Sequence, residues 1–91
     1  MSVRQPRYTP ADAAQRGDAI YDNTIRPLVE ADHQGKYVAI DIETGIWELD
    51  EDENVASERL FARVPDAQTY MTRVGYGYIR RFGAGRVRRS A

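Results

Sequence analysis

The carboxylates Asp41 and Glu43 are the residues whose type and spacing come closest to catalytic chemistry. They lie two positions apart in residues 39–45, which read AIDIETG. Alternate residues of a β-strand point to the same face. Two carboxylates on one strand face can hold divalent metal ions that activate water and stabilise a leaving oxygen. The spacing therefore matches that of a metal-dependent nuclease.

The AIDIETG string resembles the first motif of the DnaQ-like 3′–5′ exonucleases, a strand carrying Asp-x-Glu followed by Thr and Gly. That family also uses further acidic ligands downstream, with a His or Tyr base. Here the last carboxylate is Asp66, so the resemblance covers these seven residues alone. We expect Asp41 and Glu43 to be solvent-facing carboxylates beside a hairpin turn, and a nuclease is the third of three interpretations.

Other catalytic and metal-binding arrangements lack the residues that they need. The chain has no cysteine, and His33 is its single histidine, so no transition-metal site can be completed. Ser57 has no nearby base, and residues 50–53 lack the spacing of a calcium loop. We therefore expect no enzyme activity, no cofactor and no metal, with His33 as an exposed linker residue.

Length and composition predict one small domain in the cytoplasm. The chain has 91 residues, of which 42% are hydrophobic and 30% charged, enough for one core but not for two. No stretch approaches the roughly 18 apolar residues of a membrane span. The first seven residues lack the apolar region of a secretory signal, and the absence of cysteine fits a reducing compartment.

Charge is distributed unevenly along the chain. Residues 41–58 hold eight carboxylates and no basic residue, whereas residues 67–91 hold six arginines and no carboxylate. Five of these arginines lie close together among aromatic residues: Arg80, Arg81, Arg86, Arg88 and Arg89. Arginine and aromatic side chains together neutralise phosphates and stack on bases. The segment favours either nucleic-acid binding or contact with an acidic protein surface, including that of this same domain.

The first regular element should be an amphipathic helix. Thr9 can accept from the first amides, Pro10 suits the first helical position, and Asp12 completes a capping box. Apolar residues then recur at steps of three and four. Because Pro27 lacks an amide, we expect the helix to end or kink near Arg26, with one more turn beyond it.

A β-hairpin should follow in residues 36–50, because β-branched and polar residues alternate on both sides of a turn that contains glycine. If Ile42 lies opposite Trp47, the loop has an even number of residues and one face of the hairpin is apolar. The other face then carries polar side chains, namely Asp41, Glu43 and Glu48.

A second helix and a third strand complete the pattern. The acidic run in residues 50–53 can cap this helix and complement its dipole, with Arg59 and Arg63 in the last turns and Pro65 at its end. Residues 69–75 are typical of a strand. The segment after them suits a short edge strand followed by a tail.

This order of elements, α-β-β-α-β, predicts an α+β fold. A right-handed crossover places the third strand beside the first, giving a three-stranded sheet of order 2-1-3 with both helices on one face. We expect an N-terminal arm in residues 1–8, one domain in residues 9–79 and a flexible basic tail in residues 80–91. Open sheet edges favour homo-oligomers or pairing with another chain.

Much of the chain resembles a widespread family of small, uncharacterised bacterial proteins that share the AIDIETG hairpin. The resemblance runs from about residue 9 to 82 and is carried by residues 16–21, 25–27, 35–45, 56–60 and 62–67. The middle of the chain is also similar to the partial RNase-H-like domain of HicB-type antitoxins. That similarity implies a partner protein encoded by an adjacent gene, such as a toxin or a protease.

The sequence therefore favours a non-catalytic protein-binding module, antitoxin-like or an accessory subunit. Its partner would contact a sheet edge or the polar outer face of the hairpin, where apolar anchors stand beside charges. The predicted partner-binding residues are Tyr37, Asp41, Glu43, Ile46 and Glu48. The alternative is a nucleic-acid-binding protein that uses the five arginines of residues 80–89.

Overall fold

A computed structural model of the chain describes residues 8–80, with side chains up to residue 76. Its elements are α1 (Pro10–Ile20), η1 (Tyr21–Ile25), α2 (Arg26–Val29), β1 (Tyr37–Asp41), β2 (Trp47–Asp50), α3 (Glu53–Arg63), β3 (Thr69–Arg73) and β4 (Gly77–Arg80). The strands form one antiparallel sheet in the order β2-β1-β3-β4. The α+β class and the order 2-1-3 are confirmed, and β4 is the short edge strand expected after the third.

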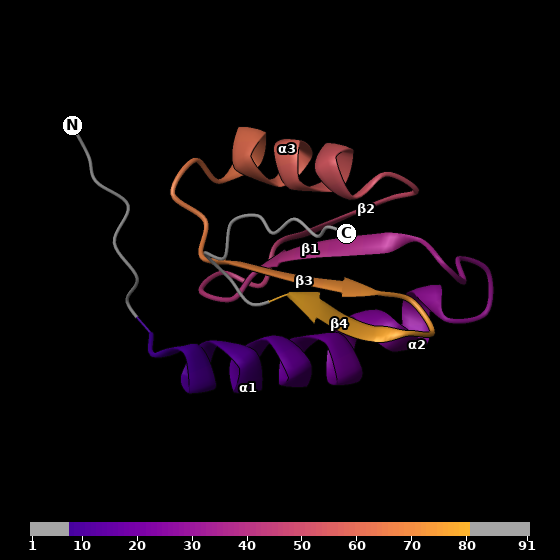
Figure 1. Cartoon of the computed structure of the whole chain (residues 1–91), viewed down its shortest axis with the longest axis horizontal. Helices are drawn as coiled ribbons and strands as arrows, with labels where there is room; N and C mark the ends of the chain where they lie inside the picture. Colours follow the sequence, from indigo (N-terminus) through magenta and orange to yellow (C-terminus); the bar gives the residue numbers. More distant parts are fainter. Residues whose placement is uncertain (1–7, 81–91) are drawn as a thin grey trace, which may run out of the picture.

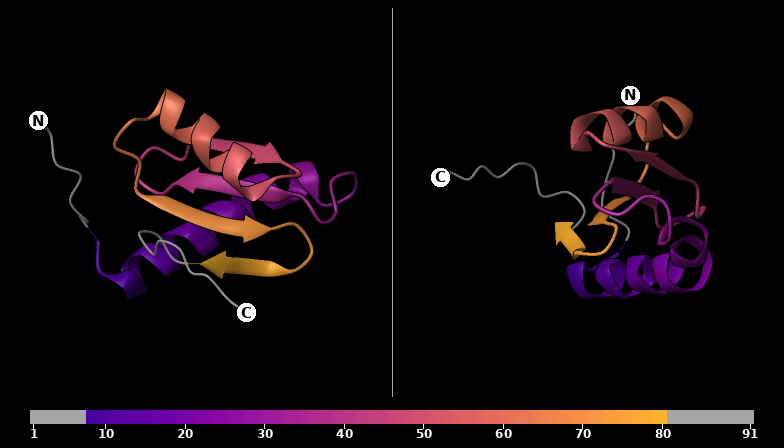
Figure 2. Two further views of the ribbon diagram at one scale, coloured as in Figure 1. Left: turned by 45° about the horizontal axis from the view of Figure 1, so that its top comes forward. Right: turned by 90° about the vertical axis from the view of Figure 1, so that its right-hand side faces the viewer.

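Helices cover both faces of this sheet (Figure 1). The α1, η1 and α2 segments run along one face, and α3 lies over β1 and β2 on the other, as the two views of Figure 2 also show. The prediction that both helices share one face is therefore wrong. Successive residues of β1 point to opposite faces, and both sets are buried, so each face has its own cluster.

The larger cluster lies between the sheet and the N-terminal helical segments. The sheet supplies Val38, Ile40, Ile42, Tyr70 and Val74, and the helices supply Ala13, Tyr21, Ile25 and Val29. Helical positions four residues apart lie on one side of a helix, which is why Tyr21, Ile25 and Val29 form one stripe. Trp47 and Leu49 pack against this cluster, on the face predicted for them.

The second cluster, beneath α3, contains smaller side chains. Its buried members are Ala39, Ala56, Leu60, Ala67 and Met71. Ala39 on β1 and Ala56 on α3 have only a methyl group each, which allows the helix to lie close to the strand. The α3 helix begins at the predicted acidic run, because the Asp52 side chain accepts from the amides of Asn54 and Val55.

The first helix begins where predicted and continues past Pro27. Thr9 Oγ1 accepts from the Asp12 amide at 3.1 Å. Before the proline the helix widens into a π turn, in which the Arg26 amide donates to Tyr21 O. The wider turn accommodates the donor that Pro27 lacks, so α2 follows instead of an end. Neither this helix nor any other in residues 8–80 is long and apolar enough to cross a membrane.

The β1–β2 hairpin is shifted by two residues from the predicted register. Ile40, not Ile42, lies opposite Trp47. Because the shift is even, the side chains keep their predicted faces. The Asp41 amide donates to Ile46 O at 2.9 Å and closes a loop of residues 42–45, an even number as predicted. Gly45 in this loop has φ of 84°, a conformation that favours glycine.

Candidate functional site

The Asp41 carboxylate is buried and bonded to the backbone around it. The residue is 1% exposed. Its Oδ1 accepts from the Gln68 amide at 2.9 Å and from the Glu43 amide at 3.3 Å. Its Oδ2 accepts from the amide and hydroxyl of Thr44 at 3.1 and 2.7 Å. The carboxylate therefore joins the hairpin turn to the segment that enters β3, and the prediction that Asp41 faces solvent is wrong.

This bonding gives the Asp-x-Glu pair a structural role. Four donors already surround the Asp41 carboxylate, whereas Glu43 lies on the exposed turn. Within residues 8–80, no group of three or more His, Asp and Glu side chains could hold a metal ion. The string that resembles an exonuclease motif thus forms an Asp-stabilised turn.

The other predicted partner-binding residues do not form an open patch. Tyr37 and Ile46 are half-buried against the cluster beneath α3. Glu48 forms an ion pair with Arg63 of α3. Of the five predicted residues, Glu43 alone is exposed. The prediction of an open outer face is wrong, because α3 occupies it.

His33 lies in the turn between α2 and β1. Its amide donates to Val29 O at 2.9 Å, and its carbonyl accepts from the Lys36 amide at 3.1 Å. The residue is half-buried, and its Nδ1 has no hydrogen-bond partner in the described part of the chain. The prediction of an exposed linker histidine is therefore wrong, and His33 belongs to the packing of this turn.

The arginines of the nucleic-acid alternative lie mostly beyond the described residues. Arg80 ends β4, opposite Met71 of β3. The other four lie outside the described range: Arg81, Arg86, Arg88 and Arg89. The structure therefore fixes where the basic segment begins, next to β3 at one edge of the sheet.

The opposite edge of the sheet belongs to β2. In an antiparallel ladder, successive residues direct their amide and carbonyl groups alternately toward and away from the partner strand. Because Ile46 O accepts from the Asp41 amide, the carbonyls of Trp47 and Leu49 point away from β1. These two carbonyls form the outer edge of β2.

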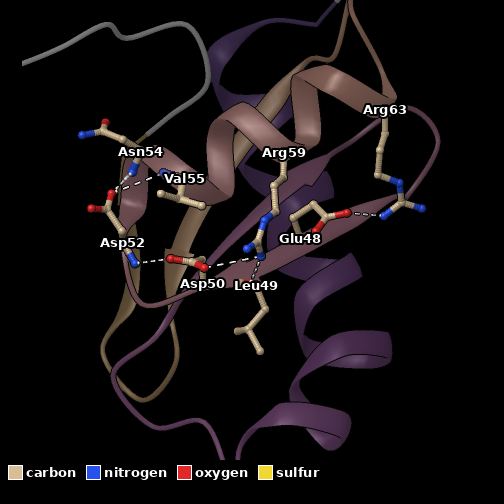
Figure 3. A network of polar contacts seen from close by, with 8 residues as sticks. All are labelled: Glu48, Leu49, Asp50, Asp52, Asn54, Val55, Arg59 and Arg63. Carbon is tan, nitrogen blue, oxygen red and sulfur yellow. Dashed lines mark hydrogen bonds and ion pairs between the residues drawn. The ribbon is translucent and has the colours of Figure 1, made fainter.

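Two arginines of α3 reach over this edge. Arg59 Nη1 donates to Leu49 O at 3.4 Å, as Figure 3 shows. Arg63 Nη1 donates to Trp47 O, also at 3.4 Å. The same guanidinium groups form ion pairs with the carboxylates of β2, Asp50 and Glu48. Charged side chains over a strand edge hinder its pairing with another strand. The β2 edge is therefore protected.

A pocket of about 210 Å³ lies on the other side of the molecule, between the N-terminal helical segments and β3. The helices line it with Asp18, Tyr21, Asp22, Arg26 and Glu30, and the sheet lines it with Tyr70 and Thr72. Successive charged positions are four residues apart, so they share one side of the helical segments. We call this site the acidic pocket.

Carboxylates outnumber cations in the acidic pocket. Arg26 forms ion pairs with Asp22 at 3.4 Å and with Glu30 at 3.8 Å, and all three side chains are about half exposed. Such exposed pairs contribute about 0–1 kcal/mol and do not exclude another cation. The Asp18 carboxylate accepts from the Tyr70 hydroxyl. Three carboxylates against one guanidinium leave the pocket negative.

Tyr21 is one of three buried residues with a hydroxyl group that line the acidic pocket, beside Tyr70 and Thr72. It is 7% exposed, and its hydroxyl has no hydrogen-bond partner among residues 8–80. Burial raises the pKa of this hydroxyl; Glu30 and Asp22 act in the same direction, and Arg26 opposes them. The hydroxyl therefore stays protonated at neutral pH, and its oxygen is available to a donor in the pocket.

The sequence carries a faint signal for this pocket. Asp18, Asp22, Arg26 and Glu30 recur at four-residue steps. Any solvated helix has a charged face of this kind. The pocket forms because β3, some 40 residues later in the chain, lies beside that face. The sequence pattern does not predict this position of β3 relative to the helix.

The charges of the described domain and of its two ends are opposite. Residues 8–80 hold all 14 carboxylates and 7 of the 13 basic residues, a formal charge of −7. Residues 1–7 and 81–91 hold the other 6 basic residues and bring the net charge to −1. The ends of the chain are therefore cationic segments attached to an anionic domain.

Comparison with known proteins adds no relative from which function can be transferred. The chain matches no family model, no curated protein and no solved structure. The relation to HicB-type antitoxins stays a prediction.

Proposed function

We propose that this protein is a non-catalytic protein-binding module, antitoxin-like or an accessory subunit of a partner encoded by an adjacent gene. Its partner binds along the flank formed by β4 and the acidic pocket. The observation that carries this proposal is the contrast between the two edges of the sheet. Arg59 and Arg63 cover the carbonyls of the β2 edge. Within residues 8–80, β4 pairs with β3 alone, so its far side is an edge.

The chemistry of this flank favours a basic, extended segment of the partner. A strand edge offers amide and carbonyl groups to an added strand, and pockets beside it accept side chains. The acidic pocket lies next to β3, the strand that pairs with β4. Its negative charge would attract Lys or Arg and steer the encounter.

The state of the Asp-x-Glu motif supports a non-catalytic role. A metal-dependent nuclease needs carboxylate oxygens that are directed at metal ions. Here the Asp41 oxygens accept from Gln68, Glu43 and Thr44. The motif that most resembles an enzyme therefore stabilises the turn.

Affinity purification of the tagged chain from the cells that produce it tests the proposal. We expect one stoichiometric partner protein with the wild type and its loss with D22N/E30Q. The matched control is E51Q/E58Q, which removes the same charge from exposed carboxylates near or on α3 and should retain the partner. Absence of a stoichiometric partner, or equal loss in both variants, contradicts the proposal. A homodimer of the purified chain in light scattering would identify the partner as a second copy.

Nucleic-acid binding by the arginine segment is the second candidate, favoured by the six cations outside residues 8–80. The formal charge of −7 on the domain opposes it, because the domain would repel a polyanion. This function predicts a steep loss of affinity with salt and loss of binding after Ala substitution of the five arginines of residues 80–89. A flat salt response would exclude it.

A further inference from the structure

We propose that the acidic pocket binds arginine side chains from residues 81–91 of the same chain. The C-terminal segment is then an internal ligand that folds back on the domain. This inference rests on the pocket and on the chain itself and does not require the partner proposed above. Its consequence, that the segment competes with that partner for the flank, rests on the proposed function.

The acidic pocket has an unused hydrogen-bond acceptor as well as negative charge. The Tyr21 hydroxyl is on a residue that is 7% exposed, lines the pocket and has no partner among residues 8–80. A guanidinium group carries five N–H donors in a planar fork and suits such a mixed set of acceptors. One arginine can donate to a carboxylate and to the tyrosine oxygen at once. These features indicate a cationic, multiply donating ligand.

The C-terminal segment has the matching charge. Residues 81–91 contain four arginines and no carboxylate side chain. Extended residues two apart are separated by roughly 6.6–7 Å, and helical residues four apart by roughly 6 Å along the axis. Arg86 and Arg88 can therefore lie opposite Asp18 and Asp22. The N-terminal cations are fewer, with two arginines in residues 1–7.

The path of the chain allows the segment to reach the pocket. β4 runs antiparallel to β3 and ends at Arg80, opposite Met71. The neighbouring residue, Tyr70, donates its hydroxyl to Asp18 at one end of the pocket. Eleven further residues span up to roughly 36–40 Å, whereas Asp18 and Glu30 are about 18 Å apart along the helix.

Binding within one chain is favoured over exchange between chains. A segment attached close to its site has an effective concentration of about the millimolar range. Exposed ion pairs are individually weak, at about 0–1 kcal/mol each. A few of them can hold a tethered segment but not assemble dimers at micromolar protein. We therefore expect a monomer whose segment is bound in cis.

Amide chemical shifts of the full ¹⁵N-labelled chain test this inference without any partner. We compare the wild type with R86Q/R88Q and with R4Q/R7Q, which removes the same charge from the other end. At low salt, R86Q/R88Q should shift the amides of Asp18, Asp22, Glu30 and Gly75, and R4Q/R7Q should leave them unchanged. Salt of about 0.5 M should move the wild-type peaks toward those of R86Q/R88Q, because screening shortens the Debye length to a few ångströms.

Peptide rescue provides the second measurement. A synthetic peptide of residues 81–91, added to R86Q/R88Q, should restore the wild-type shifts at the pocket, and the same peptide with glutamine at the arginine positions should not. Three results would overturn the inference: no shift at the pocket, shifts confined to residues 51–58, or pocket shifts that disappear on dilution as a dimer dissociates. Each of these leaves the partner purification unaffected, so the two proposals can fail separately.

Discussion

The two faces of the sheet achieve their packing by different means. On the α1 side, large side chains such as Ile40 and Tyr70 fill the space beneath the helices. On the α3 side, the small Ala39 lets the helix approach, and the buried Asp41 carboxylate ties the turn to β3. Volume dominates the first face, and small residues with hydrogen bonds dominate the second. Helices therefore cover both faces of the sheet, and the proposed binding flank is the edge formed by β4 together with the acidic pocket.

The largest effect is expected where the α3 face depends on a single carboxylate. Asp41→Ala would leave the buried Gln68 amide without its acceptor, at a cost of about 1–3 kcal/mol, and would also remove the part-buried hydrogen bonds to Thr44 and Glu43. We expect a loss of about 3 kcal/mol or more in the free energy of unfolding, measured in urea by Trp47 fluorescence. Asp41→Asn keeps one acceptor oxygen and should lose less. A loss below about 1 kcal/mol for Asp41→Ala would refute the role of the turn.

On the α1 face, Gly17 tests how tightly the helix and sheet are packed. A Cβ atom there would lie 2.0 Å from the Tyr70 ring. Gly→Ala normally stabilises a helix by about 1 kcal/mol, but overpacking costs about 1–3 kcal/mol. We expect net destabilisation in urea unfolding, and a gain instead in the Tyr70→Ala background, where both the ring and the Cγ atom are absent. Stabilisation by Gly17→Ala alone would show that this face is loosely packed.

Strongly patterned elements of this fold are predictable from the sequence. The start of α1 at Thr9, the cap of α3 and the order 2-1-3 follow from local chemistry and chain connectivity. The covered α3 face does not, because Ala39 shares its strand face with Tyr37 and Asp41, and this pattern gives little sign of burial. Asp41 has the same pattern whether its carboxylate meets water or the Gln68 amide. The packing of α3 and of the segment before β3 decides whether Ala39 and Asp41 are buried or exposed, and the sequence pattern does not show this packing.

A smaller effect is expected at the protected edge of β2. R59Q/R63Q removes donors to the Leu49 and Trp47 carbonyls together with exposed ion pairs, and such pairs contribute about 0–1 kcal/mol. Stability should therefore fall by less than about 1 kcal/mol. Self-association should rise, as measured by light scattering over a concentration series, because the edge is uncovered. R26Q/K36Q is the control of equal charge, and equal association of both variants would contradict the edge argument.

The smallest effect concerns the Tyr21 hydroxyl at high pH. Its pKa is raised from the ordinary value of 10.0 by burial above all, with support from Glu30 and Asp22 and opposition from Arg26. The folded state therefore favours the neutral hydroxyl. The stability that this neutral form contributes is complete below pH 10 and is lost as the pH rises through the raised pKa of the folded state. In an absorbance titration, wild type should contain one tyrosine, absent from Tyr21→Phe, that ionises only above the ordinary pKa of 10.0. Ionisation of this tyrosine at the ordinary pKa of 10.0 would contradict the burial of Tyr21.

The α3 helix covers one face of the sheet. If it did not, Asp41, Glu43 and Glu48 would form an exposed surface that a partner could contact. Ala39→Leu tests this coverage most directly, since the added side chain would point toward α3. Ala39 of β1 is fully buried beneath that helix. Overpacking there should lower the free energy of unfolding, measured in urea, by about 1–3 kcal/mol. Unchanged or increased stability would show that α3 does not cover the sheet and would contradict the account.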